Sequence, residues 1–384
     1  MSVNAKCAMV KPAVFFWQNM PAHHQTGALD AFAGTWGAPV YGVWAEDISS
    51  DRRGDGWQAS RRSHLRDVFL PSVGWREKVD ELASDNPGAI HVFSGVGAYP
   101  AVTRAARIIM SQPRPKVALI VETALKSPWR RLPSTLKSIY HYYPVRAKIG
   151  AVMAIGSLAE NFFRSIGFKE SQVYPYLYQC DAPRICAEDA TSGELRIAFV
   201  GRLAPYKGLD LLLEALAPLA DRAWSLGVYG DGPAKAQLQE KARRLGLASR
   251  ICFHGLIASD AVVSALSAHD LCVVPSRYDG WGMATSEALQ AGVPVLVSDA
   301  SGSRDIIRAS GAGVVFPSGN VHVLNSLLAQ RLDDPGVIPE EKRRARAYAP
   351  KISPVNVGRY LAESFEHAFL GRMPRPPADW LNLT

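Results

Sequence analysis

Two carboxylates flank a glycine-containing loop in the segment 275–301, PSRYDGWGMATSEALQAGVPVLVSDAS. Asp279 begins the loop and Glu287 follows eight residues later. The flanking residues predict a buried strand at 270–275, a loop at 279–282, a helix at about 283–291 and a second strand at 294–299. A small-residue loop that enters a helix leaves backbone N–H groups unpaired at the positive end of the helix dipole. The segment therefore suits phosphate or another anion.

The two acids have a separate predicted task. If Gly282, Met283 and Ala284 turn into the helix, their amides would face a diphosphate, and Glu287 would reach sugar hydroxyls one turn further in. A carboxylate repels phosphate, so the pair is expected to address hydroxyl groups on either side of it. At this point a plainer interpretation stays open, with Asp279 as a turn residue and Glu287 as a solvated helix residue.

These residues need a scaffold of alternating strands and helices, and the second half of the chain predicts one. Apolar strand-like runs alternate with helix-like segments at 208–219, 234–245 and 260–269. The pattern predicts a doubly wound parallel α/β domain at 190–348.

The first half repeats the pattern less clearly. Strand-like runs at 13–17, 40–44, 89–95, 116–122 and 151–156 predict a first Rossmann-like domain at 1–178. After the first run, a polar loop containing His23 and His24 is expected to open a helix near Gly27; it is either a surface loop or part of a ligand crevice. We expect the linker at 174–193, where the periodicity is lost, and a terminal helix within 349–384 that crosses back to the first domain.

Composition sets the class and the expected compartment. The 384 residues are 48% hydrophobic and 20% charged, as in soluble globular proteins. The five cysteines are odd in number and lack CxxC spacing, which argues for a reducing compartment and against a zinc site. We find no signal peptide pattern and no run of 18 apolar residues, and expect a cytoplasmic protein.

The net charge of +8 is concentrated in the first half, where residues 1–188 carry 22 Lys and Arg against 15 Asp and Glu. Between Arg104 and Lys148 there are ten basic residues and one acid, Glu122. Lacking any nucleic-acid-binding motif, this half is not expected to bind nucleic acid. An anionic membrane surface at the inner face of the plasma membrane suits the interleaved aromatic and basic residues Trp129, Arg130, Arg131, Lys137, Tyr140, Tyr142 and Tyr143. An acidic soluble acceptor and ordinary solvated charge stay open as explanations.

Three segments in order, GRLAPYKGLDLLLEAL (201–216), GVYGDGP (227–233) and the segment at 275–301, resemble the retaining glycosyltransferases of family 4, the group 1 glycosyltransferases. The resemblance covers about 195–332 well and implies the GT-B fold, two doubly wound Rossmann-like domains that face a central cleft. It implies that Arg202 and Lys207 supply cations to the donor diphosphate and that Glu287 holds the ribose. Asp279 matches the first acid of the family pattern, which addresses the donor sugar, but is one methylene shorter than the family's Glu.

The remaining donor contacts follow from the same resemblance. Gly201, Gly230 and Gly282 are the loop glycines, Met283 and Ala284 begin the helix, and backbone near Ile257 is expected to contact the base. Family members often carry a histidine after a strand of the first sheet, where this chain offers Glu122. An ion pair of Glu122 with Arg130 or Lys126 is the competing interpretation. His24, Gln25 and Gly27 are the acceptor-side candidates.

The resemblance implies a retaining, metal-independent transfer of a hexose-type sugar from a UDP- or GDP-sugar to a hydroxyl of a saccharide, with no cofactor beyond this co-substrate. The basic first half favours a lipid-linked saccharide acceptor, as in the assembly of bacterial-type surface polysaccharide or glycolipid. Two alternatives are a sugar-phosphate synthase or nucleotide-sugar epimerase on the same fold, and a catalytically inactive nucleotide-sugar-binding protein.

Overall fold

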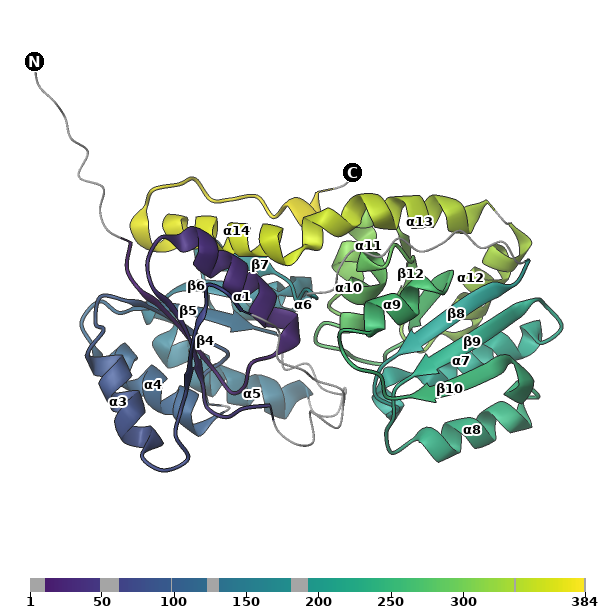
Figure 1. Ribbon diagram of the computed structural model, residues 1–384, viewed down its shortest axis with the longest axis horizontal. Helices are drawn as coiled ribbons and strands as arrows, with labels where there is room; N and C mark the ends of the chain where they lie inside the picture. The colour runs from purple at the N-terminus through teal and green to yellow at the C-terminus, as the bar shows by residue number, and fades with distance from the viewer. Residues whose placement is uncertain are drawn as a thin grey trace, which may run out of the picture.

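The structure is a computed structural model that describes residues 11–48, 62–97, 99–122, 131–180, 193–334 and 336–382. It contains two sheets, both wholly parallel, that lie side by side with helices on their faces (Figure 1). The predicted α/β class and doubly wound architecture are confirmed.

The first sheet has the strand order β3-β2-β1-β4-β5-β6-β7. Its strands are β1 (Val14–Gln18), β2 (Val40–Trp44), β3 (Arg66–Phe69), β4 (Ile90–Phe93), β5 (Lys116–Val121), β6 (Ile149–Ile155) and β7 (Val173–Tyr176). The order reverses between β1 and β4, and at such a switch point a crevice opens at the carboxyl ends of the strands.

The second sheet has the order β10-β9-β8-β11-β12-β13, with its reversal between β8 and β11. Its strands are β8 (Leu195–Val200), β9 (Trp224–Tyr229), β10 (Ile251–Gly255), β11 (Leu271–Val274), β12 (Val295–Ser298) and β13 (Gly313–Phe316). Both sheets therefore offer their loops at the carboxyl strand ends for a shared site.

The helices that cover the sheets are mostly short. Those of the first half are α1 (His23–Trp36), α3 (Trp75–Ser84), α4 (Pro100–Ser111), α5 (Arg131–Tyr142) and α6 (Gly156–Ser165). Those of the second half are α7 (Leu209–Leu216), α8 (Lys235–Arg244), α9 (Val262–Ser267), α10 (Met283–Gln290), α11 (Arg304–Ser310), α12 (Val321–Asp333) and α13 (Val337–Tyr348), and they are followed by α14 (Pro354–Phe365).

Three local expectations for the first half are wrong. His23 and His24 are not in a loop, because α1 begins at His23 directly after the extended residue Ala22 and contains Gly27. Strand β3 was not expected, since it is an edge strand with little burial and hence little alternation of polar and apolar residues. Strand β7 extends from Val173 into the start of the expected linker at 174–193 and is a buried strand of the first sheet.

The terminal helix α14 packs on α1, and α13 and α14 run along both halves of the molecule (Figure 1). Gly358 makes the close approach possible, because a Cβ there would lie 2.7 Å from the Ala28 carbonyl oxygen. Phe32 and Phe365 complete the contact edge to face, with ring centroids 5.5 Å apart.

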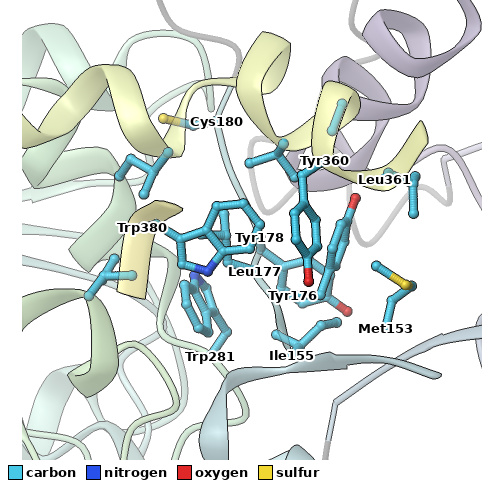
Figure 2. Close-up of a cluster of buried hydrophobic side chains, with 14 of the residues drawn as sticks. Met153, Ile155, Tyr176, Leu177, Tyr178, Cys180, Trp281, Tyr360, Leu361 and Trp380 are labelled. Carbon is cyan, nitrogen blue, oxygen red and sulfur yellow. The ribbon is translucent and has the colours of Figure 1, made fainter. Parts of the chain in front are cut away.

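One hydrophobic cluster joins the two halves. It contains Tyr178 from the end of the first half, Trp281 from the loop before α10, and Tyr360 and Trp380 from the C-terminal segment (Figure 2). Burying aromatic side chains from three parts of the chain fixes the loop at 279–282 relative to the first sheet.

Two sets of hydrogen bonds cross the same boundary. The Asp305 carboxylate accepts bonds of 2.7 Å from the Ser157 backbone N–H and 2.9 Å from its hydroxyl, so it caps α6 from the other half of the chain. The Ser286 hydroxyl donates to the Tyr178 carbonyl oxygen over 3.0 Å and accepts from the Trp281 indole over 2.9 Å. These contacts hold the facing loops of both sheets in one arrangement.

Candidate active site

A cavity of about 530 Å³ lies between the loops that follow the strands of both sheets, and we call it the central cavity. From the second half it receives the loops after β8, β9, β10 and β11, and from the first half residues after β1, β5 and β7. The residues that line it are His23, His24, Glu122, Tyr178, Val200, Gly201, Arg202, Tyr206, Lys207, Tyr229, Gly230, Asp231, Leu256, Ile257, Ser259, Val262, Asp279, Trp281, Gly282, Met283 and Glu287.

Most of the residues singled out from the sequence meet in this cavity. They are Gly201, Arg202, Lys207, Gly230, Ile257, Asp279, Gly282, Met283 and Glu287 from the second half, with Glu122 and His24 from the first. Three do not line it. Ala284 is buried in the hydrophobic cluster, Gln25 lines a neighbouring cavity, and Gly27 lies on α1 and lines neither cavity.

The neighbouring cavity, called the N-terminal cavity below, has a volume of about 310 Å³. It lies at the carboxyl ends of β1, β4 and β5 and includes Ser94, Tyr99 and Gln25. The Gln25 side-chain oxygen accepts a 2.7 Å bond from the Gln18 amide, and both side chains are buried. His24, Glu122 and Tyr178 line both cavities, so the two adjoin at these side chains.

Glycines at two positions allow backbone segments beside the central cavity to approach closely or to adopt a positive φ. Gly230 has a φ of 142°, and a Cβ there would collide with the Gly201 carbonyl oxygen. Gly282, with a φ of 92°, precedes α10 and offers no side chain to cap it. The start of α10 is therefore built as the sequence predicts for an anion-binding helix terminus.

Lys207 and Asp279 form an ion pair, with the Lys207 Nζ 2.6 Å from the Asp279 Oδ2. Burial is the largest single influence on Lys207 and lowers its pKa, but the charge of Asp279 and the hydrogen bond to it, with smaller contributions from Tyr206 and Glu122, together give this ammonium a raised pKa. The sequence resemblance assigned Lys207 to a diphosphate and Asp279 to a sugar. In the structure the cation contacts the acid directly.

Arg277 holds the two segments of this pair together. Its guanidinium donates to both carboxylate oxygens of Asp210, over 2.8 and 2.6 Å, and to the Pro205 carbonyl oxygen over 2.6 Å. Tyr206 and Tyr278 stack beside it, with centroids 5.0 Å apart. The segment that carries Lys207 is thereby fixed against the one that carries Asp279.

Glu287 is only 5% exposed, which rules out the interpretation of a solvated helix residue. Burial raises the pKa of its carboxyl to about 7, although the Lys207 charge acts in the opposite direction. In the described part of the chain its carboxylate has no hydrogen-bond partner, yet it lines the cavity. A carboxyl held this way is available to a ligand.

Glu122 follows β5 and lines the cavity beside the loop that begins at Asp279. Burial, and to a smaller extent repulsion by the Asp279 carboxylate, raises the pKa of this carboxyl to about 7. The positive charge of Lys207 acts in the opposite direction. Its carboxylate touches Gly280, where a Cβ would collide with it. The ion-pair partners expected from the sequence, Lys126 and Arg130, lie outside the described residues.

The two histidines at the start of α1 both line the central cavity. Burial lowers the pKa of His23 to about 4, so its ring is neutral at neutral pH. The His24 ring lies edge to face with Tyr178, the centroids 4.4 Å apart. Sequence reasoning missed Tyr178, because it follows β7 inside the supposed linker and carries no motif.

Trp281, Tyr206 and Tyr229 were also missed as lining residues, although all three stand within the segments that carry the resemblance.

Within the described residues, no three His, Cys, Asp or Glu side chains gather as a group that could hold a metal ion. No helix in the described ranges is both long enough and apolar enough to span a bilayer.

Residues 187–352 match the family described as glycosyl transferases group 1. The chain is 32% identical over 154 residues to 2-deoxystreptamine glucosyltransferase of Streptomyces kanamyceticus, 40% of each chain. It is 31% identical over 171 residues to D-inositol 3-phosphate glycosyltransferase of Gordonia bronchialis, 42% of this chain and 37% of the relative. The matched segments thus span about two fifths of these curated relatives.

Solved structures match over nearly the whole chain at lower identity. Anabaena HepE in complex with UDP covers 93% of this chain and 100% of its own, with a TM-score of 0.70 and 17% identity. WaaG, a glycosyltransferase involved in lipopolysaccharide biosynthesis, covers 93% and 99%, with a TM-score of 0.62 and 16% identity. This likeness extends the match from the second half to the fold of both halves.

Proposed function

We propose a function on the premise that the chain has the GT-B fold and that its residues 187–352 belong to the glycosyl transferases group 1. The protein transfers a hexose-type sugar from a nucleoside-diphosphate sugar to a hydroxyl of a saccharide. The supporting observation is that one cavity contains the cations Arg202 and Lys207 and the acids Asp279 and Glu287 of the second half together with the acid Glu122 of the first half. UDP in complexes of HepE supports a UDP-sugar as the first donor to test.

The donor diphosphate would lie at the start of α10. There Arg202 and Lys207 and the backbone N–H groups after Gly282 neutralise the charge that grows as the bond from sugar C1 to the diphosphate oxygen breaks. These protein groups take the part that a divalent ion plays in other transferases, so we propose a metal-independent reaction. Diphosphate binding would draw Lys207 away from Asp279 and leave that acid for the sugar hydroxyls.

Glu287 would accept hydrogen bonds from the ribose, which gives its buried carboxylate the partner that it lacks in the described chain. The acceptor would enter from the N-terminal cavity, where Glu122 faces the reacting carbon. With a pKa near 7, Glu122 is suited to take the proton of the attacking hydroxyl. Attack from the face that the diphosphate leaves would retain the anomeric configuration.

The experiment is release of UDP or GDP from a panel of nucleotide sugars with and without saccharide acceptors, with EDTA present throughout. We expect acceptor-dependent turnover and a product that NMR shows to have the anomeric configuration of the donor. Lys207→Ala should abolish transfer, whereas Arg243→Ala, in an exposed pair with Glu240, should not change it. Turnover without an acceptor would favour an epimerase or hydrolase, and binding without turnover would favour an inactive binding protein.

We further propose that the protein works in the cytoplasm at an anionic membrane surface and acts on a lipid-linked saccharide. Support comes from the exposed Leu136 and Tyr140 on α5 and Tyr143 after it, beside the exposed Lys137. Tyr142, assigned to this surface from the sequence, instead packs on Phe163 in the core. Trp129 and Arg130 lie outside the described residues.

This surface can be tested by sedimentation with phosphatidylglycerol vesicles. The double variant L136E/Y140E should lose vesicle binding, while Val355→Glu, a change at an equally exposed apolar residue of α14, should keep it. Equal binding of all three proteins would refute the assignment of this surface.

A further inference from the structure

A third hollow, of about 350 Å³, opens on the first half of the chain and has no part in the donor chemistry above. We call it the cationic recess. It lies where α3 and α4 begin, and its lining includes Trp75, Arg76, Tyr99, Thr103, Arg104 and Arg107. Three of its lining residues are arginines and none is an acid, so the recess attracts an anion.

The arginines are not equally available. Arg104 is paired with Asp80, whose carboxylate accepts from the Arg104 Nε over 2.6 Å, and Glu77 also acts on its charge. Arg76 lies over the Trp75 ring, 4.7 Å from its centroid, and Arg107 is exposed. Among the described residues, neither Arg76 nor Arg107 has a carboxylate partner. Two guanidinium groups therefore face this recess without a counter-charge, and each can bind a phosphate or carboxylate in bidentate fashion.

The cationic recess, the N-terminal cavity and the central cavity share lining residues. Tyr99 lines both the cationic recess and the N-terminal cavity. His24, Glu122 and Tyr178 line both the N-terminal cavity and the central cavity. The cationic recess therefore adjoins the N-terminal cavity, which in turn adjoins the cavity that Glu122 lines.

We infer that the acceptor is an extended, anionic saccharide whose phosphate or carboxylate group binds at Arg76 and Arg107 while its reacting hydroxyl lies beside Glu122. This inference rests on the proposed function. A single neutral sugar would fill the N-terminal cavity and leave the recess empty. The aromatic rings of Trp75 and Tyr99 give the intervening sugar apolar surfaces to pack on.

The inference is tested by calorimetric titration of glucose 6-phosphate, glucuronate and glucose into protein saturated with UDP, so that the donor cations are already occupied. The proteins are the wild type, R76A/R107A, and the charge-matched control R66A/R114A, whose exposed arginines line none of the three hollows. Loss of two charge-assisted contacts should weaken both anions about tenfold or more in R76A/R107A only. Equal thermal midpoints of the three proteins show that the variants are folded.

Unchanged anion affinity in R76A/R107A, or no anion binding by the UDP-saturated wild type, would overturn the inference. Phosphatidylglycerol vesicles form a second arm. If R76A/R107A lost vesicle binding but kept its affinity for glucose 6-phosphate, the recess would be a lipid contact and the acceptor assignment would be wrong. Failure to bind UDP at all would instead count against the proposed function, which keeps the two failures apart.

Discussion

Replacing Glu287 by Gln tests two separate effects of this buried acid: how much its burial lowers the free energy of unfolding, and how much its carboxylate contributes to donor binding. The carboxyl is 5% exposed, and burial raises its pKa from 4.5 to about 7. Gln has nearly the same shape and carries no charge. The substitution should therefore stabilise the ligand-free protein at alkaline pH while it weakens the donor site.

The sign and size of the effect follow from proton linkage. Between pH 4.5 and about 7 the folded chain holds a proton on Glu287 that the unfolded chain has released, so the free energy of unfolding falls as pH rises through this window. Below pH 4.5 both states are protonated and the penalty vanishes. At about 1.4 kcal/mol per pKa unit, the full penalty above pH 7 is roughly 3 kcal/mol, of which roughly 2 kcal/mol develops between pH 5 and pH 8.

The assay is thermal unfolding of the wild type and Glu287→Gln at pH 5 and pH 8, with and without UDP. For the unit that contains α10 we expect Glu287→Gln to raise the midpoint at pH 8 by about 6–12 °C and at pH 5 by only about a third as much. The same variant should lose most of the UDP-induced rise in the midpoint, because a neutral amide makes a weaker bond to a ribose hydroxyl. Glu240→Gln, on the exposed face of α8, is the control and should behave as the wild type. A wild-type pH dependence in Glu287→Gln would refute the burial argument, and an unchanged response to UDP would refute the ribose assignment.

Three further substitutions test the supports of the site. Arg277→Ala removes the clamp on Asp210 and should lower kcat/KM about tenfold with little change in the thermal midpoint, because the Lys207 segment loses its fixed position; a midpoint drop that accounts for the lost activity would contradict this. Gly230→Ala should destabilise the protein by about 2 kcal/mol or more in denaturant unfolding, since its φ of 142° and its approach to a backbone carbonyl both exclude a Cβ. Asp305→Ala uncaps α6 across the boundary between the halves and should cost about 1–2 kcal/mol in the same assay, and no loss would show that the bonds do not contribute to stability.

The second half was predictable from sequence because its chemistry lies in short contiguous motifs. The loop after β8, the glycines after β9 and the start of α10 each carry a pattern in which local sequence dictates local backbone. The bounds of α10 were predicted to within one residue, Met283–Gln290 against about 283–291. Arg277 stands in the same segment, but its role as a clamp depends on a partner 67 residues away, which spacing does not reveal.

The first half was less predictable because burial there is decided by partners distant in sequence. His23 and His24 were assigned to a loop because Pro21 and Gly27 are turn formers in isolation. The helix forms nevertheless, since its buried face of Leu29, Phe32 and Trp36 packs under α14, more than 300 residues later in the chain. Tertiary packing overrides local propensity in such an element.

Dependence on residues distant in sequence also explains why the sequence identified the acids of the site but not their ion pairing or their pKa values. Two carboxylates with an upstream lysine suggested separate binding tasks, and the sequence placed all three in one region. It did not show that Lys207 pairs with Asp279, or that burial brings Glu122 and Glu287 to pKa values near 7. Those states arise because the loops of both sheets close around one cavity, where Lys207 neutralises the nearest acid and leaves the other two partly protonated. The site therefore holds Lys207 in a pair with Asp279 near two further acids, and a diphosphate, which competes for that cation, would redistribute charge among them.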